Sequence, residues 1–487
     1  MSLRINKNVL STLLRTGVLA LSCGLAMPTA MASDLPALGD ASSGIVSPEQ
    51  EYLLGRAWLS LVRGQVRQLS DPLLKEYVET SVYRLAETSQ VQDRRFEFVL
   101  LESPELNAFA APGGIIGVNG GLFLHAETEA EYASVMAHEL AHLSQRHFAR
   151  GLEAQQQIQI PVMAAMLAGV VASAVGAADV GMAAITSSQA AAYQAQTKFS
   201  RQNEQEADRI GLVNLERAGY SPQAMPAMFE RLIRQYRYVQ KPPEFLTTHP
   251  LSESRVADTK NRADMLPKQG VNDTLRYQLM RARMTLKFET TPGISARQFR
   301  SELNADPQNY AARYGLALAL MRTGQYDEAR THLANLLERA PGELAYNLAQ
   351  VELDTNTKRM AQANDRIERL RRTYPDSFPI QQVQAELLQK QNRIRESSEI
   401  LNQLIKRRPK DPDIWYEVAE VRGLMGDTLG VHQARAEFFA LVGDYDQAFE
   451  QLDYAKRRSP NFQTAARMDA RLRELKEEKR MVDQILQ

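Results

Sequence analysis

Cysteine is almost absent from this chain: its 487 residues include a single one, Cys23. That residue lies within an apolar N-terminal segment, and the sequence before it, Ala20-Leu21-Ser22, is a poor lipoprotein signal. The rest of the chain cannot form a disulfide bond within itself. Its domains must therefore be stabilised by packing and polar contacts, even in an oxidising compartment.

An excess of charge of either sign is also missing. Lysine and arginine together number 58, as do aspartate and glutamate, so the formal net charge is zero. Such a chain has no general attraction for nucleic acid or for an anionic membrane, and we expect no nucleic-acid partner. Hydrophobic residues make up 44% of the chain, which is enough for folded cores, and the length predicts two or more domains.

Long hydrophobic runs are few, and the first stands at the N-terminus. Basic residues are followed by an apolar run from Gly17 to Met27 and then by Ala30-Met31-Ala32, a small-residue cleavage pattern. This order is typical of a secretory signal peptide. We therefore expect residues 1–32 to be removed by cleavage near Ala32 and the chain to be exported.

Histidine is scarce, with seven residues, yet two of them stand four apart in the motif HELAH at 138–142. Residues four apart share one helical face, so His138 and His142 can bind one metal ion through two imidazoles. Glu139 would lie beside the open coordination position. There it can accept a proton from the attacking water and return it to the leaving amine, which makes it the candidate catalytic base.

The residues around this motif predict a helix. Thr128 and Glu131 form the capping-box pattern T-x-x-E at its start. Apolar residues then follow at helical spacing, namely Tyr132, Val135, Met136, Leu140 and Leu143.

A catalytic zinc site usually has three protein ligands, so a third is needed. The motif EQEAD, at 204–208, offers Glu204. Asp208, four residues later on the same helical face, can accept the outer N–H of a liganding histidine and so support catalysis. Glu206 is the alternative ligand, but it lies on a different face and lacks a carboxylate four residues later.

The combination HExxH and ExxxD resembles the M48 zinc metallopeptidases. The resemblance continues in Phe96–Phe123, which is similar to the family's strand and turn beside the catalytic helix and includes N-A-F-x-x-P-G-G at Asn107–Gly114. It also includes the pattern H-P-x-x-x-x-R at His249 and Arg255, and covers roughly residues 47–262. It implies a gluzincin-type domain over 33–265 with one zinc ion per subunit. Asn107 and Arg255 would then support the site or the substrate. The chain lacks the several spanning helices of the membrane-embedded relatives.

His249 remains open among three roles. It can be a structural histidine, a donor to the oxyanion of the tetrahedral intermediate, or a regulatory fourth zinc ligand. As a ligand it would hold the enzyme off until the loop around Pro250 moves. We lean toward this role, because an unregulated endopeptidase among unfolded proteins is hazardous.

A second apolar run, residues 161–186, is long enough to span a membrane but stands between His142 and Glu204. Both residues must reach one metal ion, and a single crossing would separate them. The run must therefore leave and return on one side. We keep two interpretations: a buried helical hairpin, or a lid or loop that contacts the membrane surface beside the site.

A repeat occupies the C-terminal part of the chain. Prolines at 307, 341, 375 and 409 recur every 34 residues, and Ala329, Ala363 and Ser397 stand at a fixed offset before the last three. This period resembles the tetratricopeptide repeat, an α-solenoid in which small residues let paired helices approach closely. We expect it over residues 273–487, with an extra helix at about 429–442. Trp415 is expected to pack between repeats rather than to contact a ligand.

Together, the signal peptide, the M48-like domain and the repeats are similar to exported peptidases of Gram-negative bacteria. That similarity implies a periplasmic zinc endopeptidase that promotes assembly of outer-membrane β-barrel proteins and degrades misassembled ones. Its repeats would bind stalled barrel proteins and their assembly machinery. The alternative is a periplasmic chaperone or scaffold with tightly repressed peptidase activity. The sequence further predicts that residues up to about 265 fold and bind zinc alone, but no longer engage large clients.

Overall fold

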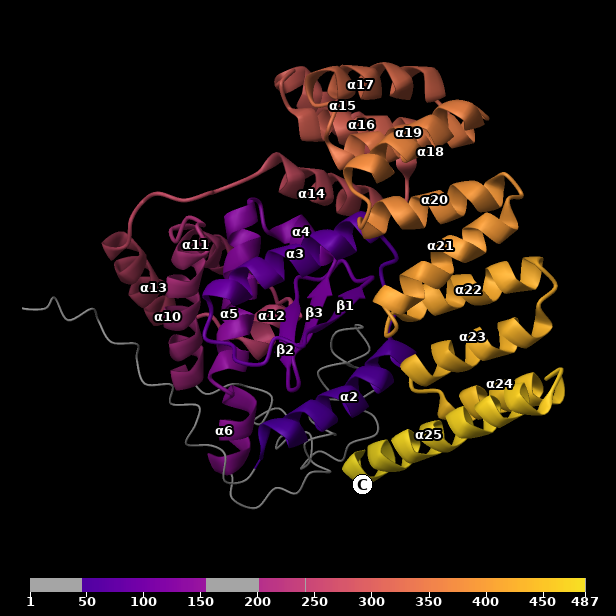
Figure 1. Cartoon of the computed structure of the whole chain (residues 1–487). Coiled ribbons are helices and arrows are strands. Elements are labelled where there is room, and N and C mark those ends of the chain that lie inside the picture. The colour runs from indigo at the N-terminus through magenta and orange to yellow at the C-terminus, as the bar shows by residue number, and fades with distance from the viewer. Residues whose placement is uncertain (1–45, 155–200, 241, 487) are drawn as a thin grey trace, which may run out of the picture. The chain divides into compact units, whose positions relative to one another are not determined.

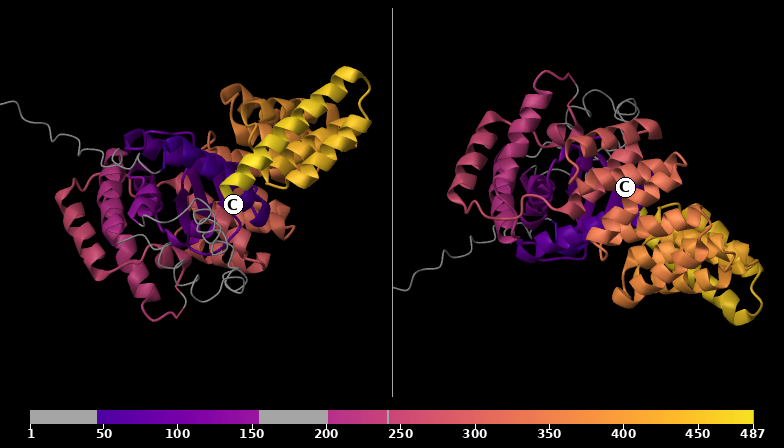
Figure 2. Two further views of the ribbon diagram at one scale, coloured as in Figure 1. Left: turned by 90° about the horizontal axis from the view of Figure 1, so that it is seen from below. Right: turned by 90° about the horizontal axis from the view of Figure 1, so that it is seen from above.

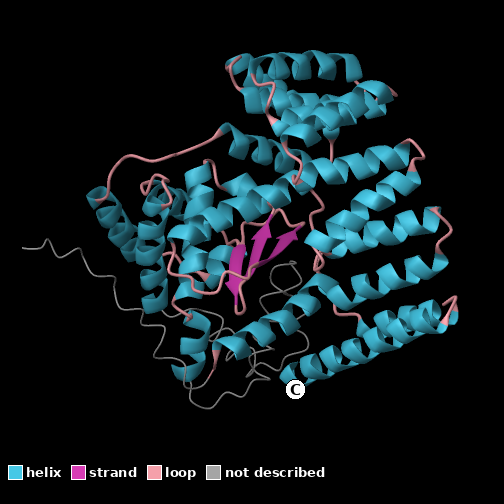
Figure 3. Cartoon of the chain, viewed as in Figure 1, coloured by secondary structure: helices cyan, strands magenta, loops and turns pink. Residues whose placement is uncertain are grey.

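The computed structural model describes residues 46–154, 201–240 and 242–486. Helices make up most of these residues, and one small sheet accompanies them (Figure 3). The predicted mainly α-helical class with a small β element is confirmed. The predicted signal peptide and the apolar run 161–186 lie outside the described residues. Among the residues described, no helix combines the length and apolar character needed to cross a membrane.

Two capped helices open the described chain: α2 (Pro48–Gln65) and α3 (Pro72–Thr88). Ser47 and Gln50 exchange hydrogen bonds between side chain and backbone at the start of α2, and Asp71 caps α3. Each helix has proline in its first turn, where the missing N–H would have no helical partner. The cap and the proline therefore define the first turn of each helix.

The sheet has three strands in the order β1-β3-β2. β1 (Glu97–Leu101) runs parallel to β3 (Ile115–Asn119), and β2 (Ala108–Ala111) runs antiparallel to it. The short helix α4 (Gly121–His125) follows β3. β2 is therefore an edge strand, and it packs against the helix that carries HELAH.

That helix is α5 (Glu129–Ser144), and it is buried along its length from Glu129 to His142. Thr128 caps it by accepting a hydrogen bond from the backbone N–H of Glu131 at 3.3 Å. The Glu131 carboxylate accepts from the backbone of Glu127 instead of Thr128, so only half of the predicted capping box forms. After α5 the chain turns into α6 (His147–Ala154).

Helix α10 (Arg201–Arg217) lies alongside α5 (Figure 1). Gly211 permits this approach, since a Cβ at that position would lie 3.1 Å from the backbone nitrogen of His138. The remaining helices of this part are α11 (Ala224–Tyr236), α12 (Glu244–Thr248) and α13 (Glu253–Met265).

The C-terminal part is an array of paired helices (Figures 1 and 2). The prolines at 307, 341, 375 and 409 each follow the end of α15, α17, α19 or α21, and Ala329, Ala363 and Ser397 are fully buried. The predicted repeat and the predicted extra helix, α23, are confirmed. The helices are α14 (Leu275–Phe288), α15 (Pro292–Ala305), α16 (Tyr310–Arg322), α17 (Tyr326–Arg339), α18 (Leu344–Asn356), α19 (Met360–Thr373), α20 (Phe378–Lys390), α21 (Ile394–Arg407), α22 (Pro412–Leu424), α23 (Thr428–Leu441), α24 (Tyr445–Arg457) and α25 (Phe462–Leu486).

The boundary predicted near residue 265 does not separate two cores. Tyr277 on α14 is fully buried and stacks on Phe123, with ring centroids 5.7 Å apart. The start of α5 also depends on this region, because the carbonyl of Asn272 accepts from Ala130 N at 2.9 Å and Asp273 accepts from Glu129 N at 3.1 Å. One hydrophobic cluster runs from α3 through α14 into the first repeats.

Trp415 packs partly buried against the hydrophobic cluster of the later repeats, and its Nε1 donates to the carbonyl of Pro409 at 2.8 Å. It also lines a cleft of about 490 Å³ between α2 and the last repeat helices. The repeats are held to α3 by an ion pair of 2.6 Å between Lys75 and Asp411.

Candidate active site

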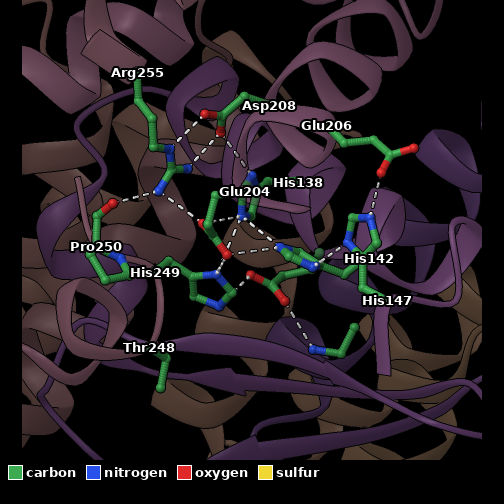
Figure 4. A network of polar contacts seen from close by, with 12 residues as sticks. His138, His142, His147, Glu204, Glu206, Asp208, Thr248, His249, Pro250 and Arg255 are labelled. Atoms are coloured by element: carbon green, nitrogen blue, oxygen red, sulfur yellow. Dashed lines mark hydrogen bonds and ion pairs between the residues drawn. The ribbon is translucent and has the colours of Figure 1, made fainter. Parts of the chain in front are cut away.

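Three elements bring four potential ligands together. Helix α5 supplies His138 and His142, α10 supplies Glu204, and the turn after α12 supplies His249 (Figure 4). One ligand atom from each residue can be chosen so that all four lie within 4.8 Å of one another. All four side chains are buried.

The distances between these atoms suit a zinc ion. Tetrahedral zinc with bonds of about 2.0–2.1 Å needs ligand atoms roughly 3.3 Å apart. Nε2 of His138 lies 3.0 Å from Nε2 of His142 and 3.4 Å from Nδ1 of His249. Oε1 of Glu204 lies 3.1 Å from Nδ1 of His249 and 3.5 Å from Nε2 of His142. Two imidazoles and a carboxylate are also a donor set typical of catalytic zinc.

Electrostatics makes this cluster a site for a cation. Burial alone would raise the pKa of Glu204, but the imidazoles of His249 and His138 hold it well below its ordinary value. Burial opposes protonation of His138, yet its contacts with Asp208 and Glu204 outweigh burial and raise its pKa to about 10. Burial and the neighbouring His138 lower the pKa of His142 well below its ordinary value. The carboxylates thus favour positive charge at this position, which a bound cation would supply.

Glu139 lies between the cluster and the edge strand. Its Oε2 accepts a hydrogen bond from the backbone N–H of Ala110 on β2 at 3.0 Å, and its Oε1 lies 3.5 Å from Nε2 of His249. Burial raises the pKa of this carboxyl above its ordinary value, because a charged group is poorly solvated there. A carboxylate of raised basicity beside the cluster can accept a proton from water.

Asp208 and Arg255 form the support behind His138. Oδ1 of Asp208 lies 3.0 Å from Nδ1 of His138, as expected for the partner of a liganding ring. Arg255 binds Asp208 through two hydrogen bonds of 2.7 Å. It also pairs with Glu204 at 2.8 Å and donates to the carbonyl of Pro250 at 2.9 Å. Its guanidinium therefore joins α10 to the turn that carries His249.

A fourth histidine, His147, lies beside the cluster and was not predicted from the sequence. Nδ1 of His147 lies 2.8 Å from Nδ1 of His142, and its Nε2 lies 3.2 Å from Oε2 of Glu206. Glu206, the alternative ligand, lies outside the four-residue cluster and pairs with Arg150 at 2.9 Å. Burial lowers the pKa of His147 to about 4, so the ring is neutral near pH 7. The sequence does contain a sign of this histidine's role, since three of the seven histidines fall between residues 138 and 147.

Asn107 precedes β2 and is buried. Its carbonyl accepts from the backbone of Asn119 at 3.1 Å, while its Oδ1 finds no hydrogen-bond partner among the described residues. The structure thus brings seven predicted residues into one site, namely His138, Glu139, His142, Glu204, Asp208, His249 and Arg255, and it places Asn107 directly before β2, the strand whose Ala110 contacts Glu139.

Comparison with known proteins gives matches over both halves of the chain. Residues 72–263 match peptidase family M48, and residues 297–352 match the tetratricopeptide repeat. The β-barrel assembly-enhancing protease of Escherichia coli (strain K12) is 34% identical over 97% of this chain and 97% of its own length. A putative β-barrel assembly-enhancing protease of Vibrio cholerae is 32% identical over 86% of this chain and 87% of its own. The mitochondrial metalloendopeptidase OMA1 of Schizosaccharomyces pombe is 29% identical over 39% of this chain and 55% of its own.

Proposed function

The chain belongs to peptidase family M48, and from that premise we propose that it is an exported zinc endopeptidase that cleaves unfolded or misassembled proteins in the periplasm. Membership of the family makes it a metallopeptidase. The observation that carries the proposal is the buried cluster of two histidines, a glutamate and a further histidine with Glu139 beside it.

His138, His142 and Glu204 would hold one zinc ion per subunit. A bound zinc ion would polarise the peptide carbonyl and lower the pKa of its water ligand to about 7. Asp208 keeps the hydrogen of His138 on Nδ1, so that Nε2 faces the cluster, and Arg255 holds Asp208 and Glu204 in place.

Glu139 is the proposed general base and acid. Its Oε2 is fixed by Ala110 on the edge strand, which leaves Oε1 directed toward the cluster. From there it takes a proton from the attacking water and returns it to the nitrogen of the leaving amine. Asn107 is proposed to support this edge of the site through its place before β2.

His249 is the proposed regulatory fourth ligand. Support comes from its Nδ1, which lies 3.1 Å from Glu204 and 3.4 Å from His138, among the ligand atoms themselves. A ring in that place would occupy the coordination position that the attacking water needs. Peptide cleavage would then require the turn at Pro250, held by Arg255, to move.

The repeats are the proposed client-binding part, since arrays of this kind bind proteins or peptides. Two similar proteins are named for β-barrel assembly. We extend that role to this chain: it promotes assembly of outer-membrane β-barrel proteins and degrades those that misassemble. The proposed export signal at residues 1–32 would bring it to their compartment. Contact with the membrane surface through residues 161–186 also remains a proposal.

The proposal is tested with Glu139→Gln. The amide preserves shape but cannot accept the proton, so zinc content should match that of the wild type while cleavage of an unfolded client falls by at least about 10²-fold. His138→Ala and Glu204→Ala should lose both cleavage and the bound metal. Wild-type cleavage by Glu139→Gln would exclude this residue as the base.

A second function is favoured by the position of His249: a chaperone or assembly scaffold whose peptidase activity is tightly repressed. Barrel assembly assayed with Glu139→Gln separates the two. Full assembly without cleavage supports the scaffold as the main role, and loss of assembly together with cleavage supports the peptidase.

A further inference from the structure

His147 lies beside the cluster of potential ligands because the helix is interrupted just before it. Five residues along an unbroken helix, a side chain points roughly 140° away from the first. Between α5 and α6, however, Arg146 adopts a left-handed conformation with φ of 49°. Its side chain donates to Glu51 at 3.1 Å and to the carbonyl of Val46 at 2.6 Å, which holds the break. The ring of His147 is thereby returned to that of His142, and it is 1% exposed.

The hydrogen bonds of this ring have a definite direction. Glu206, paired with Arg150, only accepts, so Nε2 of His147 must carry the hydrogen at their 3.2 Å contact. In a neutral imidazole the other nitrogen is then an acceptor. Nδ1 of His142, 2.8 Å away, is therefore the donor. That tautomer leaves Nε2 of His142 free of hydrogen and facing the cluster.

We infer that His147, backed by Glu206, is a positioning residue that fixes the ring and tautomer of His142 for metal binding. The two liganding histidines are then supported differently. His138 faces the carboxylate of Asp208, whereas His142 faces a neutral ring with a carboxylate one step further away (Figure 4). Partners of this kind typically contribute 10–100-fold to metal affinity.

This inference rests on the proposed zinc site. Its test is the zinc dissociation constant of the full-length chain, measured by competition with a chromophoric chelator. His147→Leu removes the acceptor and should weaken zinc binding by about 10–100-fold. His147→Asn places an oxygen near the position of Nδ1 and should stay within about threefold of wild type. His147→Gln reaches toward Glu206 but offers no acceptor to His142, and should bind as weakly as His147→Leu.

His125→Leu is the matched control, because this partly buried histidine lies outside the cluster. Thermal unfolding of the metal-free proteins separates positioning from general stability. A purely structural residue would lower the unfolding temperature of all three variants and leave the zinc affinity of the folded protein unchanged.

Two results would overturn the inference: wild-type affinity in folded His147→Leu, or equal affinity in His147→Asn and His147→Gln. If His147→Leu does not fold, the zinc affinities of His147→Asn and His147→Gln alone test the inference. A wild-type chain that binds no zinc would instead refute the proposed metal site itself, and the inference with it.

Discussion

Among single residues, His249 gives the clearest test, because its two functional roles predict opposite effects of its removal on the cleavage rate. Its Nδ1 lies among the ligand atoms, and its Nε2 lies 3.5 Å from Glu139. A side chain in that position would compete with water for the proposed zinc ion. A donor to the oxyanion would instead leave the ligand position open.

We expect His249→Ala to raise the rate at which an unstructured peptide is cleaved, with zinc content unchanged. Three ligands remain after the substitution, which is the number that catalytic zinc sites usually keep. The rate is measured under single-turnover conditions so that release of product does not limit it. A fall of about 10²-fold would assign the donor role instead.

Among the elements, the contact between α5 and α10 sets the distance from His138 to Glu204. A Cβ on Gly211 would meet the backbone of His138 at 3.1 Å and that of Ala137 at 3.2 Å. Backbone atoms cannot rotate away as a side chain can, so α10 would have to shift.

Gly211→Ala should therefore weaken zinc binding several-fold and destabilise the protein by about 1–3 kcal/mol. Gly423→Ala on α22 is the control, since its Cβ would make an ordinary contact of 3.7 Å with Val431. That substitution should be neutral or stabilise the protein by up to about 1 kcal/mol. Equal zinc affinity in both variants would show that the close approach is not needed.

The packing of α20 on α22 should make stability depend on pH. Burial and the charge of Glu386 raise the pKa of Glu417 from 4.5 to about 8. Gln382 donates to Oε1 of Glu417 at 2.6 Å, while Oε2 is buried without a hydrogen-bond partner in the described structure. A carboxyl with a raised pKa contributes stability that is fully present below pH 4.5 and is lost as the pH rises through about 8.

Glu417→Gln removes this titration. Relative to wild type, the variant should gain stability as the pH is raised from 5 to 9, by about 1 kcal/mol or more at pH 9. Urea unfolding at several pH values measures the difference. A stability difference that stays constant over this range would contradict the assignment.

In the whole molecule, the catalytic helix depends on the chain beyond the predicted boundary. Asn272 and Asp273 accept hydrogen bonds from the first turn of α5, and Tyr277 fills the space beside Phe123 and Tyr132. A fragment ending at residue 265 would lose all of these contacts.

We therefore expect a fragment that ends after Met265 to unfold at a lower temperature and to bind zinc more weakly than one that ends after Phe288. Both fragments should fail to engage large clients, because both lack the repeats from α15 onward. In the full chain, Asp273→Ala should cost about 1 kcal/mol, as for the loss of a helix cap. Equal stability and zinc content in the two fragments would show that the peptidase domain ends near residue 265, as the sequence predicts.

The sequence alone was sufficient wherever the information is local. The helix around HELAH and the 34-residue repeat both follow from spacing along the chain, and the structure confirms them. Two histidines four apart must share a helical face, so His138 and His142 could be paired without a fold.

Contacts between distant segments were decided only by the tertiary structure. The left-handed turn at Arg146 brings His147 to His142, the turn after α12 brings His249 to Glu204, and Asp273 caps a helix 144 residues away. Spacing along the chain carries no record of such contacts, because they depend on how whole helices pack. The metal site itself could therefore be predicted from the sequence, whereas the contact of His147 with His142 and the hydrogen bond of Asp273 to the start of α5 could not.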